Sequence, residues 1–232
     1  MKRLAVLLLL FAAALPAPVA TAPPPEYVQA VEFPYYLYPR TLWERELVWL
    51  KTIGVSTVEF SIPWNWHQVE AGEFDFTGRT SPRRDLVGFV RLLRRLGLRA
   101  WVRPLPADAR AQRAWLKALE TVLATQTASH GGPIAFVEGR ALAIDAAAPP
   151  APVAVISAID PSAFIRSRQA LAGAARALLW TDVEDALYPA GWAANPASLL
   201  RKGAVGLSGD ERPATSALRR DAALLRNWAR LF

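Results

Sequence analysis

The sequence predicts an α/β fold, a small (β/α)8 TIM-like barrel, from three observations. The chain has 232 residues, 53% hydrophobic and 20% charged, which suits one sizeable core and is too apolar for a disordered chain. Short apolar runs alternate with segments of helical periodicity, as expected for a parallel sheet. Seven or eight such runs and a closing helix favour a barrel over an open sheet, although roughly 210 mature residues is near the lower size limit.

Two predicted helices separate the first three strands. Leu42 to Ile53 has apolar residues on one helical face, and Gly54 stands where a left-handed C-terminal cap is expected. Ser81-Pro82 predicts an N-cap followed by proline at the first helical position, and Gly97 ends this second helix. The strands of this half are expected at Val31 to Tyr38, Val55 to Ile62 and Leu98 to Val102.

The alternation continues through the second half of the chain. Glu138-Gly139 also fits a hairpin turn, which makes the segment from Ile134 to Asp145 the weak point of the barrel prediction. Asp160-Pro161 predicts the cap of a helix that runs to about Ala175. The other expected elements are a helix at Ala107 to Thr125, strands at Ile134 to Val137, Val153 to Ser157, Ala177 to Thr181 and Ala204 to Leu207, and a final helix from near Pro213.

The N-terminus has the pattern of a secretory signal peptide. Lys2 and Arg3 precede an apolar run from Leu4 to Leu15, and small residues follow up to Ala22. The run is too short to span a membrane. We therefore expect a signal peptide over 1–22, a Pro-rich lead over 23–30, a barrel domain over 31–232, and a secreted or periplasmic protein without a transmembrane span after signal removal. An uncleaved N-terminal anchor is the alternative.

The net charge of +7 does not by itself indicate a nucleic-acid partner. The basic residues are mostly arginines scattered along the chain, and no block of five occurs. The densest group, at 91, 94, 95 and 99, alternates with leucines as the wet face of an amphipathic helix would. We expect a solvated face here rather than a phosphate-binding patch, and no nucleic-acid partner.

Several kinds of chemistry lack their motifs in this sequence. The chain has no Cys, and His67 and His130 are its only histidines, too few for a His-rich zinc site. A Gly-x-Ser-x-Gly elbow and a phosphate-binding Gly-rich loop before Lys-Ser/Thr are both missing. The sequence therefore predicts no metal site.

Several short segments follow one another in an order typical of one enzyme family. They are Tyr38 to Arg40, Trp43, Trp64 to His67, Gly72 to Phe76, Arg103 to Pro106 and Gly131 to Ile134. These segments resemble glycoside hydrolase family 35, the β-galactosidases, whose members have a Tyr-Pro-Arg and a Trp near the first strand, a Trp-Asn-x-His-Glu-Pro run, a Gly-x-Phe-Asp-Phe turn, an Arg-Pro-Gly-Pro strand end and a Gly-Gly-Pro-Ile. The resemblance implies a barrel, carbohydrate as the ligand, and chemistry that uses only carboxylates, without a cofactor. It is strongest from 31 to 137 and looser beyond.

The departures from the family pattern concern the sugar site. An ungapped alignment lays the family's Asn-Glu pair, whose Glu is the general acid/base, on Ala141-Leu142, and neither residue can transfer a proton. The Glu of the His-Glu-Pro run is Gln68 here, and a family Tyr is Ser61. The resemblance therefore implies a barrel that has lost most of its sugar-holding positions.

The nucleophile region of the family keeps several carboxylates in this chain. The family places its nucleophile in a Thr-Glu segment before a Gly-Trp, and Asp182, Glu184 and Asp185 lie in the corresponding segment. A retaining glycosidase needs two carboxyl groups about 5 Å apart. The one substitute pair available is Glu138 with Asp182, each just past a strand, where barrels carry their chemistry. A merely solvated Glu138 is the alternative.

Two functional hypotheses follow. The first is a non-catalytic barrel that binds carbohydrate or a cell-envelope partner, and we favour it because several site positions are replaced together. The second is an active glycosidase that hydrolyses galactosides with relocated carboxylates. Exposed indoles stack on sugar rings, although Trp is more often a packing residue. The residues expected to bind substrate are Trp64, Asn65, His67, Arg103 and Trp192.

Overall fold

The computed structural model describes most of the chain between residues 27 and 181. The described residues are 27–139, 142–158, 160, 162–173, 175–181, 186–187, 200–201, 219 and 223. The predicted signal peptide and the strand at Ala204 to Leu207 lie outside them. So does most of the predicted closing helix, of which Arg219 and Ala223 are described and helical. None of the described helices is long and apolar enough to cross a membrane.

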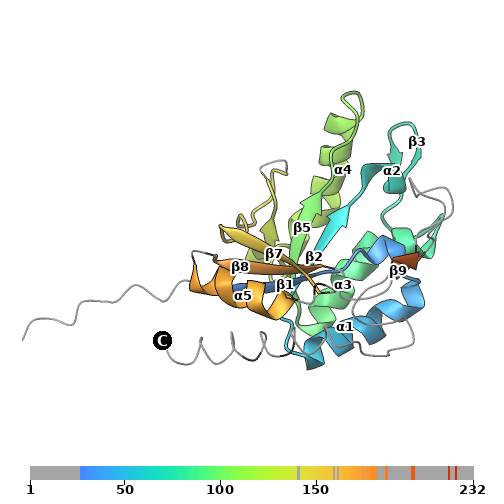
Figure 1. Ribbon diagram of the computed structural model, residues 1–232. Coiled ribbons are helices and arrows are strands. Elements are labelled where there is room, and N and C mark those ends of the chain that lie inside the picture. Colours follow the sequence, from blue (N-terminus) through green and yellow to red (C-terminus); the bar gives the residue numbers. More distant parts are fainter. Residues whose placement is uncertain are drawn as a thin grey trace, which may run out of the picture.

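Six parallel strands form one twisted sheet in the order β6-β5-β2-β1-β8-β7 (Figure 1). The α/β prediction is confirmed. Two short antiparallel pairs, β3 with β4 and β9 with β10, lie outside this sheet. The strands are β1 Val28–Glu32, β2 Thr57–Ile62, β3 Gln68–Glu70, β4 Glu73–Phe74, β5 Arg99–Pro104, β6 Ile134–Val137, β7 Val153–Ser157, β8 Ala177–Thr181, β9 Ala186–Leu187 and β10 Leu200–Arg201.

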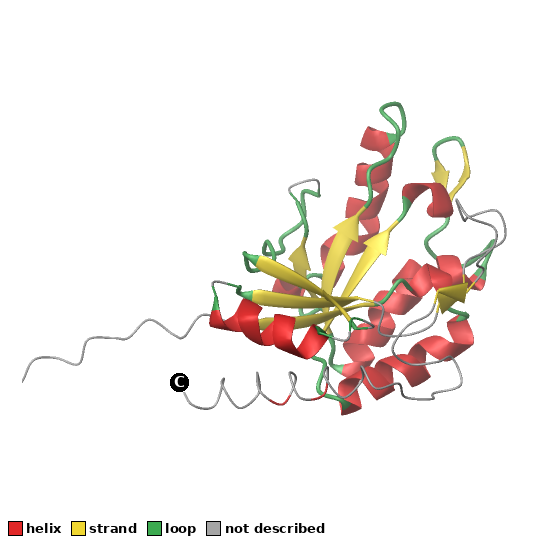
Figure 2. Cartoon of the chain, in the orientation of Figure 1, coloured by secondary structure: helices red, strands yellow, loops and turns green. Residues whose placement is uncertain are grey.

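Helices connect the strands and cover one side of the sheet (Figure 2). Helices α1 and α3 pack against each other, α3 also contacts β5, and α5 contacts β7. The α-helices are α1 Trp43–Thr52, α2 Trp64–His67, α3 Leu86–Leu96, α4 Gln112–Leu123 and α5 Ala163–Ala172, and the 3-10 helices are Tyr35–Leu37, Arg40–Leu42, Pro82–Arg84, Ala124–Gln126 and Ala128–His130.

The strand order is the cyclic order of a barrel opened between β6 and β7. From β1 the chain runs outward through β2, β5 and β6 on one side, while β8 and β7 lie on the other. On the outer side of β6, Phe136 forms one isolated parallel bridge with Ala147. Val155 of β7 is 62% exposed. Within the described residues the sheet is therefore not closed, and the closed eight-stranded barrel stays a prediction.

Three element boundaries differ from the sequence-based expectation. The first strand begins at Val28 and ends at Glu32, so the expected segment up to Tyr38 turns instead into a 3-10 helix. Ser81-Pro82 starts only a 3-10 turn, and α3 is capped by Asp85, whose Oδ1 accepts the Gly88 N–H at 2.8 Å. Helix α4 starts late, at Gln112, because Asp108 accepts two backbone N–H groups in a preceding turn.

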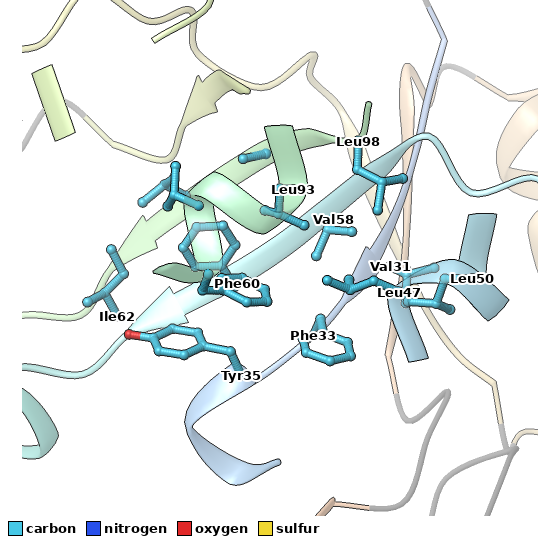
Figure 3. Packing of buried hydrophobic residues seen from close by; sticks show 14 of the residues in the cluster. Val31, Phe33, Tyr35, Leu47, Leu50, Val58, Phe60, Ile62, Leu93 and Leu98 are labelled. Carbon is cyan, nitrogen blue, oxygen red and sulfur yellow. The ribbon is translucent and has the colours of Figure 1, made fainter. Parts of the chain in front are cut away.

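The main core fills the space between the sheet and its helices (Figure 3). Aromatic rings gather at its centre, where Tyr35 and Phe89 stack with centroids 4.9 Å apart and Phe60 meets Phe89 edge to face. Alternate residues of each strand point toward this core, as Val58, Phe60 and Ile62 do on β2. The residues between them must point to the opposite face, which we call the inner face.

The inner face carries a smaller and less apolar layer. Its hydrophobic cluster consists of six buried residues, of which Trp101 and Phe136 are the aromatic ones, with ring centroids 6.4 Å apart. Toward the carboxyl ends of the strands this layer gives way to charged side chains. In parallel α/β folds, function is concentrated at that edge.

Candidate functional site

Four charged residues share the inner face at the carboxyl ends of β1, β2, β5 and β6. Glu32 is the register partner of Glu59, and Glu59 is the partner of Trp101 on β5. Arg103 lies two residues beyond Trp101 and so points to the same face. Glu138 follows β6, where its N–H donates to the Val102 carbonyl at 2.8 Å. We call Glu32, Glu59, Arg103 and Glu138 the acid–arginine cluster.

Arg103 is the centre of this cluster. Its Nε and one terminal nitrogen both donate to Glu59 Oε1, each at 2.8 Å. Its Nε also lies 3.6 Å from Glu138 Oε2. The Arg103 side chain is 33% exposed and that of Glu138 is 45% exposed, whereas Glu59 has no exposed surface. A ligand at this edge can therefore reach Arg103 and Glu138, with Glu59 behind them.

Glu59 is a buried carboxyl group with only one engaged oxygen. Its Oε2 is buried and has no hydrogen-bond partner among the residues that the structure describes. Burial raises the pKa of Glu59 to about 7, and Arg103 opposes this shift while Glu32 and Glu138 add to it. Burial lowers the pKa of Arg103, but the neighbouring Glu59 outweighs this, so the net direction is upward. The cluster thus holds its arginine charged and one of its carboxyl groups partly protonated near neutral pH.

Two further polar atoms on the inner face of β2 and β5 are buried without a partner in the described part of the chain. They are Trp101 Nε1 and Thr57 Oγ1. Thr57 lies two residues before Glu59 on β2, and Trp101 is the register partner of Glu59. The floor of the acid–arginine cluster is therefore polar, which is costly for a purely structural core.

The structure brings together two of the site residues predicted from sequence, Arg103 and Glu138. The other three predicted carboxylates, Asp182, Glu184 and Asp185, and the predicted sugar-stacking Trp192 lie outside the described residues. The pairing of Glu138 with Asp182 as two catalytic carboxylates therefore stays a prediction.

The ungapped alignment lays the family acid/base on an apolar part of the structure. Leu142, the described member of the Ala141-Leu142 pair, is 8% exposed and belongs to the main hydrophobic core. A buried leucine packed among apolar side chains can neither donate nor accept a proton.

Three predicted sugar-binding residues lie on α2, directly after β2. Asn65 is exposed, and Trp64 is half-buried against the main core. His67 is fully buried, and both ring nitrogens are engaged: Nδ1 donates to the Asp75 carbonyl at 2.6 Å, and Nε2 accepts from the Tyr35 hydroxyl at 2.5 Å. These contacts correct the expectation for His67, because neither ring nitrogen is left for a ligand.

Glu32 and Glu59 were not among the site residues predicted from sequence. The signal was present in the alternation of the second strand, where a charged Glu59 stands between Val58 and Phe60. A carboxyl at an inward position of an otherwise apolar strand is expensive to bury and so indicates a site or a pair. Its partner, Arg103, lies 44 residues away in sequence, so the pair itself needs the fold.

Comparison with known proteins identifies the part of the chain that carries these residues. The model of glycosyl hydrolases family 35 matches residues 24–107. The chain carries a family 35-like domain. Over 72 residues it is 50% identical to an exo-beta-D-glucosaminidase of Pyrococcus horikoshii, and over 94 residues 31% identical to the beta-galactosidase of Mus musculus. These alignments cover 31% and 38% of this chain but only 9% and 14% of the relatives.

Solved structures support the fold of the family 35-like domain over a longer stretch. GH5_18 from Bifidobacterium longum covers 87% of this chain and 80% of its own with a TM-score of 0.56 at 12% identity. The same protein in complex with Manb1-4GlcNAc gives a TM-score of 0.53. At this identity the likeness shows the α/β fold and no more.

Proposed function

We propose that this chain is an exported, non-catalytic glycoside hydrolase-like domain that binds carbohydrate at the acid–arginine cluster. What supports the proposal is an accessible charged cluster together with an apolar side chain at the position where the ungapped alignment lays the family acid/base. Arg103 and Glu138 are accessible at the carboxyl ends of parallel strands, while Leu142 is packed into the core. Closure of the sheet into a (β/α)8 barrel belongs to the same proposal and is supported by the cyclic strand order.

The charge of the cluster favours an amino sugar as the ligand. Two carboxyl groups, Glu59 and Glu138, share the guanidinium group of Arg103, so an added cation would lower the electrostatic energy of the site. A protonated 2-amino group on a sugar ring supplies such a cation beside neutral hydroxyls. The similarity to an exo-beta-D-glucosaminidase supports the same ligand class.

An active glycosidase is the second candidate, and the exposure of Glu138 favours it. Its side chain is 45% exposed just past β6, where a barrel enzyme holds a catalytic carboxylate. This candidate also needs Asp182, or one of its two acidic neighbours, to lie about 5 Å away for a retaining mechanism.

Binding is tested by thermal unfolding of the domain with glucosamine, galactose and glucose. A sugar present at 100 times its Kd stabilises by about 2.7 kcal/mol, which raises Tm by about 5–11 °C for a domain of this size. We expect the largest shift with glucosamine and its loss in Arg103→Gln. Arg95→Gln is the matched control, because Arg95 forms an ion pair with Glu44 away from the cluster. No shift with any sugar would refute the proposed binding function.

Export is tested by expressing the full chain in a bacterial host and recording the intact mass of the product outside the cytoplasm. We expect a loss of about 22 N-terminal residues, since the basic start, apolar run and small residues fit a signal peptide. Replacing Leu8 and Leu9 by Arg should abolish this processing by interrupting the apolar run. A full-length product retained in the cytoplasm would contradict export.

A further inference from the structure

Glu59 is placed to influence a ligand without touching it. Its side chain has no exposed surface, and its Oε1 accepts both hydrogen bonds from Arg103. Arg103 is one third exposed and lies 3.6 Å from Glu138. Any ligand that contacts Arg103 or Glu138 therefore changes the electrostatic field at Glu59.

The charges that face Glu59 come from each strand packed beside it. Glu32 approaches from β1, Arg103 from β5 and Glu138 from the end of β6. With Glu59 and Glu138 both ionised, two negative charges would share the guanidinium charge of Arg103. Moreover, Glu59 Oε2 would then be a buried charged atom with no donor within the described part of the chain, which is costly. The empty site therefore favours a protonated Glu59, in line with its pKa of about 7.

We infer that Glu59 is a positioning residue that releases its proton when a cationic sugar binds at the acid–arginine cluster. This inference rests on the proposed carbohydrate-binding function. The ligand ammonium beside Glu138 supplies a second positive charge for the two carboxyl groups, Glu59 and Glu138, that share Arg103. The Glu59 O–H bond then breaks, the proton passes to solvent, and the resulting carboxylate strengthens the pair that orients Arg103.

Linkage gives this coupling a definite sign. Because binding expels a proton, the affinity for a cationic sugar rises with pH while Glu59 is protonated in the free protein, that is below about pH 7. Between pH 5.5 and 6.5 the Kd for glucosamine should fall by about fivefold. A neutral sugar such as galactose provides no cation, so its affinity should stay flat over the same range.

The released proton can be counted by isothermal titration of glucosamine into the protein at pH 6, in two buffers of different ionisation enthalpy. At this pH about nine-tenths of Glu59 is protonated and the amine of the sugar keeps its proton. We expect release of roughly 0.5–0.9 proton per site. In Glu59→Gln release should fall to near zero while binding persists. Glu44→Gln, an exposed carboxyl on α1, should behave as the wild type does.

The outcomes separate the inference from the function on which it rests. Binding without proton release, or equal release in Glu59→Gln and the wild type, would overturn the inference alone. No binding of any sugar by the wild type would overturn the proposed function and this inference with it. If Glu59→Gln does not fold, the pH dependence of the wild-type Kd values tests the coupling instead. A Kd for glucosamine that does not change with pH overturns the coupling. A Kd that falls with rising pH for glucosamine but not for galactose supports it.

Discussion

Asp75→Ala is expected to lower the free energy of unfolding by about 3 kcal/mol, because this carboxylate holds the loop after β4 together. Asp75 is 2% exposed. Its Oδ1 accepts the backbone N–H groups of Thr77, Gly78 and Arg79 at 3.0–3.2 Å. Its Oδ2 accepts the N–H and hydroxyl of Thr80 at 2.7 and 2.6 Å. Removing the carboxylate leaves these donors without their acceptor.

The ionised form of Asp75 makes these contacts. Burial alone would raise the pKa of Asp75, but the hydrogen bonds from Thr80, Thr77 and Arg79 outweigh it and hold the pKa well below its usual range. Asp75→Asn keeps one side-chain acceptor and should lose less stability than Asp75→Ala. Urea unfolding measures both variants against Glu70→Ala, an exposed control expected within about 0.5 kcal/mol of the wild type. A loss below 1 kcal/mol in Asp75→Ala would contradict this account of the loop.

When the pH is lowered from 6.5 to 5, the free energy of unfolding of Glu59→Gln is expected to fall by about 1.5 kcal/mol, whereas that of the wild type should hardly change. Burial lowers the pKa of His67 from 6.5 to about 4. Between pH 6.5 and 5 His67 becomes protonated in the unfolded state but stays neutral in the folded state, so acidification destabilises the fold. For Glu59, burial raises the pKa from 4.5 to about 7. There the folded state binds the extra proton, and acidification stabilises the fold.

The two groups therefore oppose each other in the wild type, and removing Glu59 exposes the effect of His67. The test is a set of urea unfolding curves at pH 6.5, 6.0, 5.5 and 5.0 for the wild type, Glu59→Gln and the exposed control Glu44→Gln. Parallel pH profiles for Glu59→Gln and the wild type would show that Glu59 carries no raised pKa. Asp75 does not enter this window, because its pKa lies below it.

The strands were predictable where an apolar run is bounded by residues that break regular structure. The bounds of β6, β7 and β8 agree with the sequence-based prediction, and prolines or glycines stand near their ends, as Pro133 does before β6. Gly97 ends α3 as predicted, with a φ of +67°, and the left-handed position expected at Gly54 is confirmed by its φ of +99°. Each of these features depends on residues only a few positions apart in the sequence, so the local sequence is enough to predict it.

Features that depend on tertiary contacts were harder to predict. Asp85 rather than Ser81 caps α3, although both are good N-cap residues. Arg40 contributes to this choice, since it donates to Asp85 Oδ2 across 45 residues of sequence. His67 is a second example. Its place in a sugar-site motif suggested that it contacts a ligand, whereas its ring nitrogens form hydrogen bonds with Tyr35 and Asp75.

The acid–arginine cluster shows which residues of a site can be predicted from the sequence. Arg103 and Glu138 were predictable because each stands at a strand end, where parallel folds place function. Glu32 and Glu59 join them only through the register of β1, β2 and β5. Periodicity gives the face that a strand residue occupies, but register requires knowing which strands are neighbours.

Binding and hydrolysis of one compound on one sample test the central claim most directly. The compound is p-nitrophenyl β-D-glucosaminide, used with the wild type, Arg103→Gln and Glu138→Gln. Our account predicts saturable binding by the wild type, weakened in Arg103→Gln, with no release of nitrophenol. Release of nitrophenol that disappears in Glu138→Gln would instead show an active glycosidase, and a wild type that does not bind would contradict a sugar site at the acid–arginine cluster.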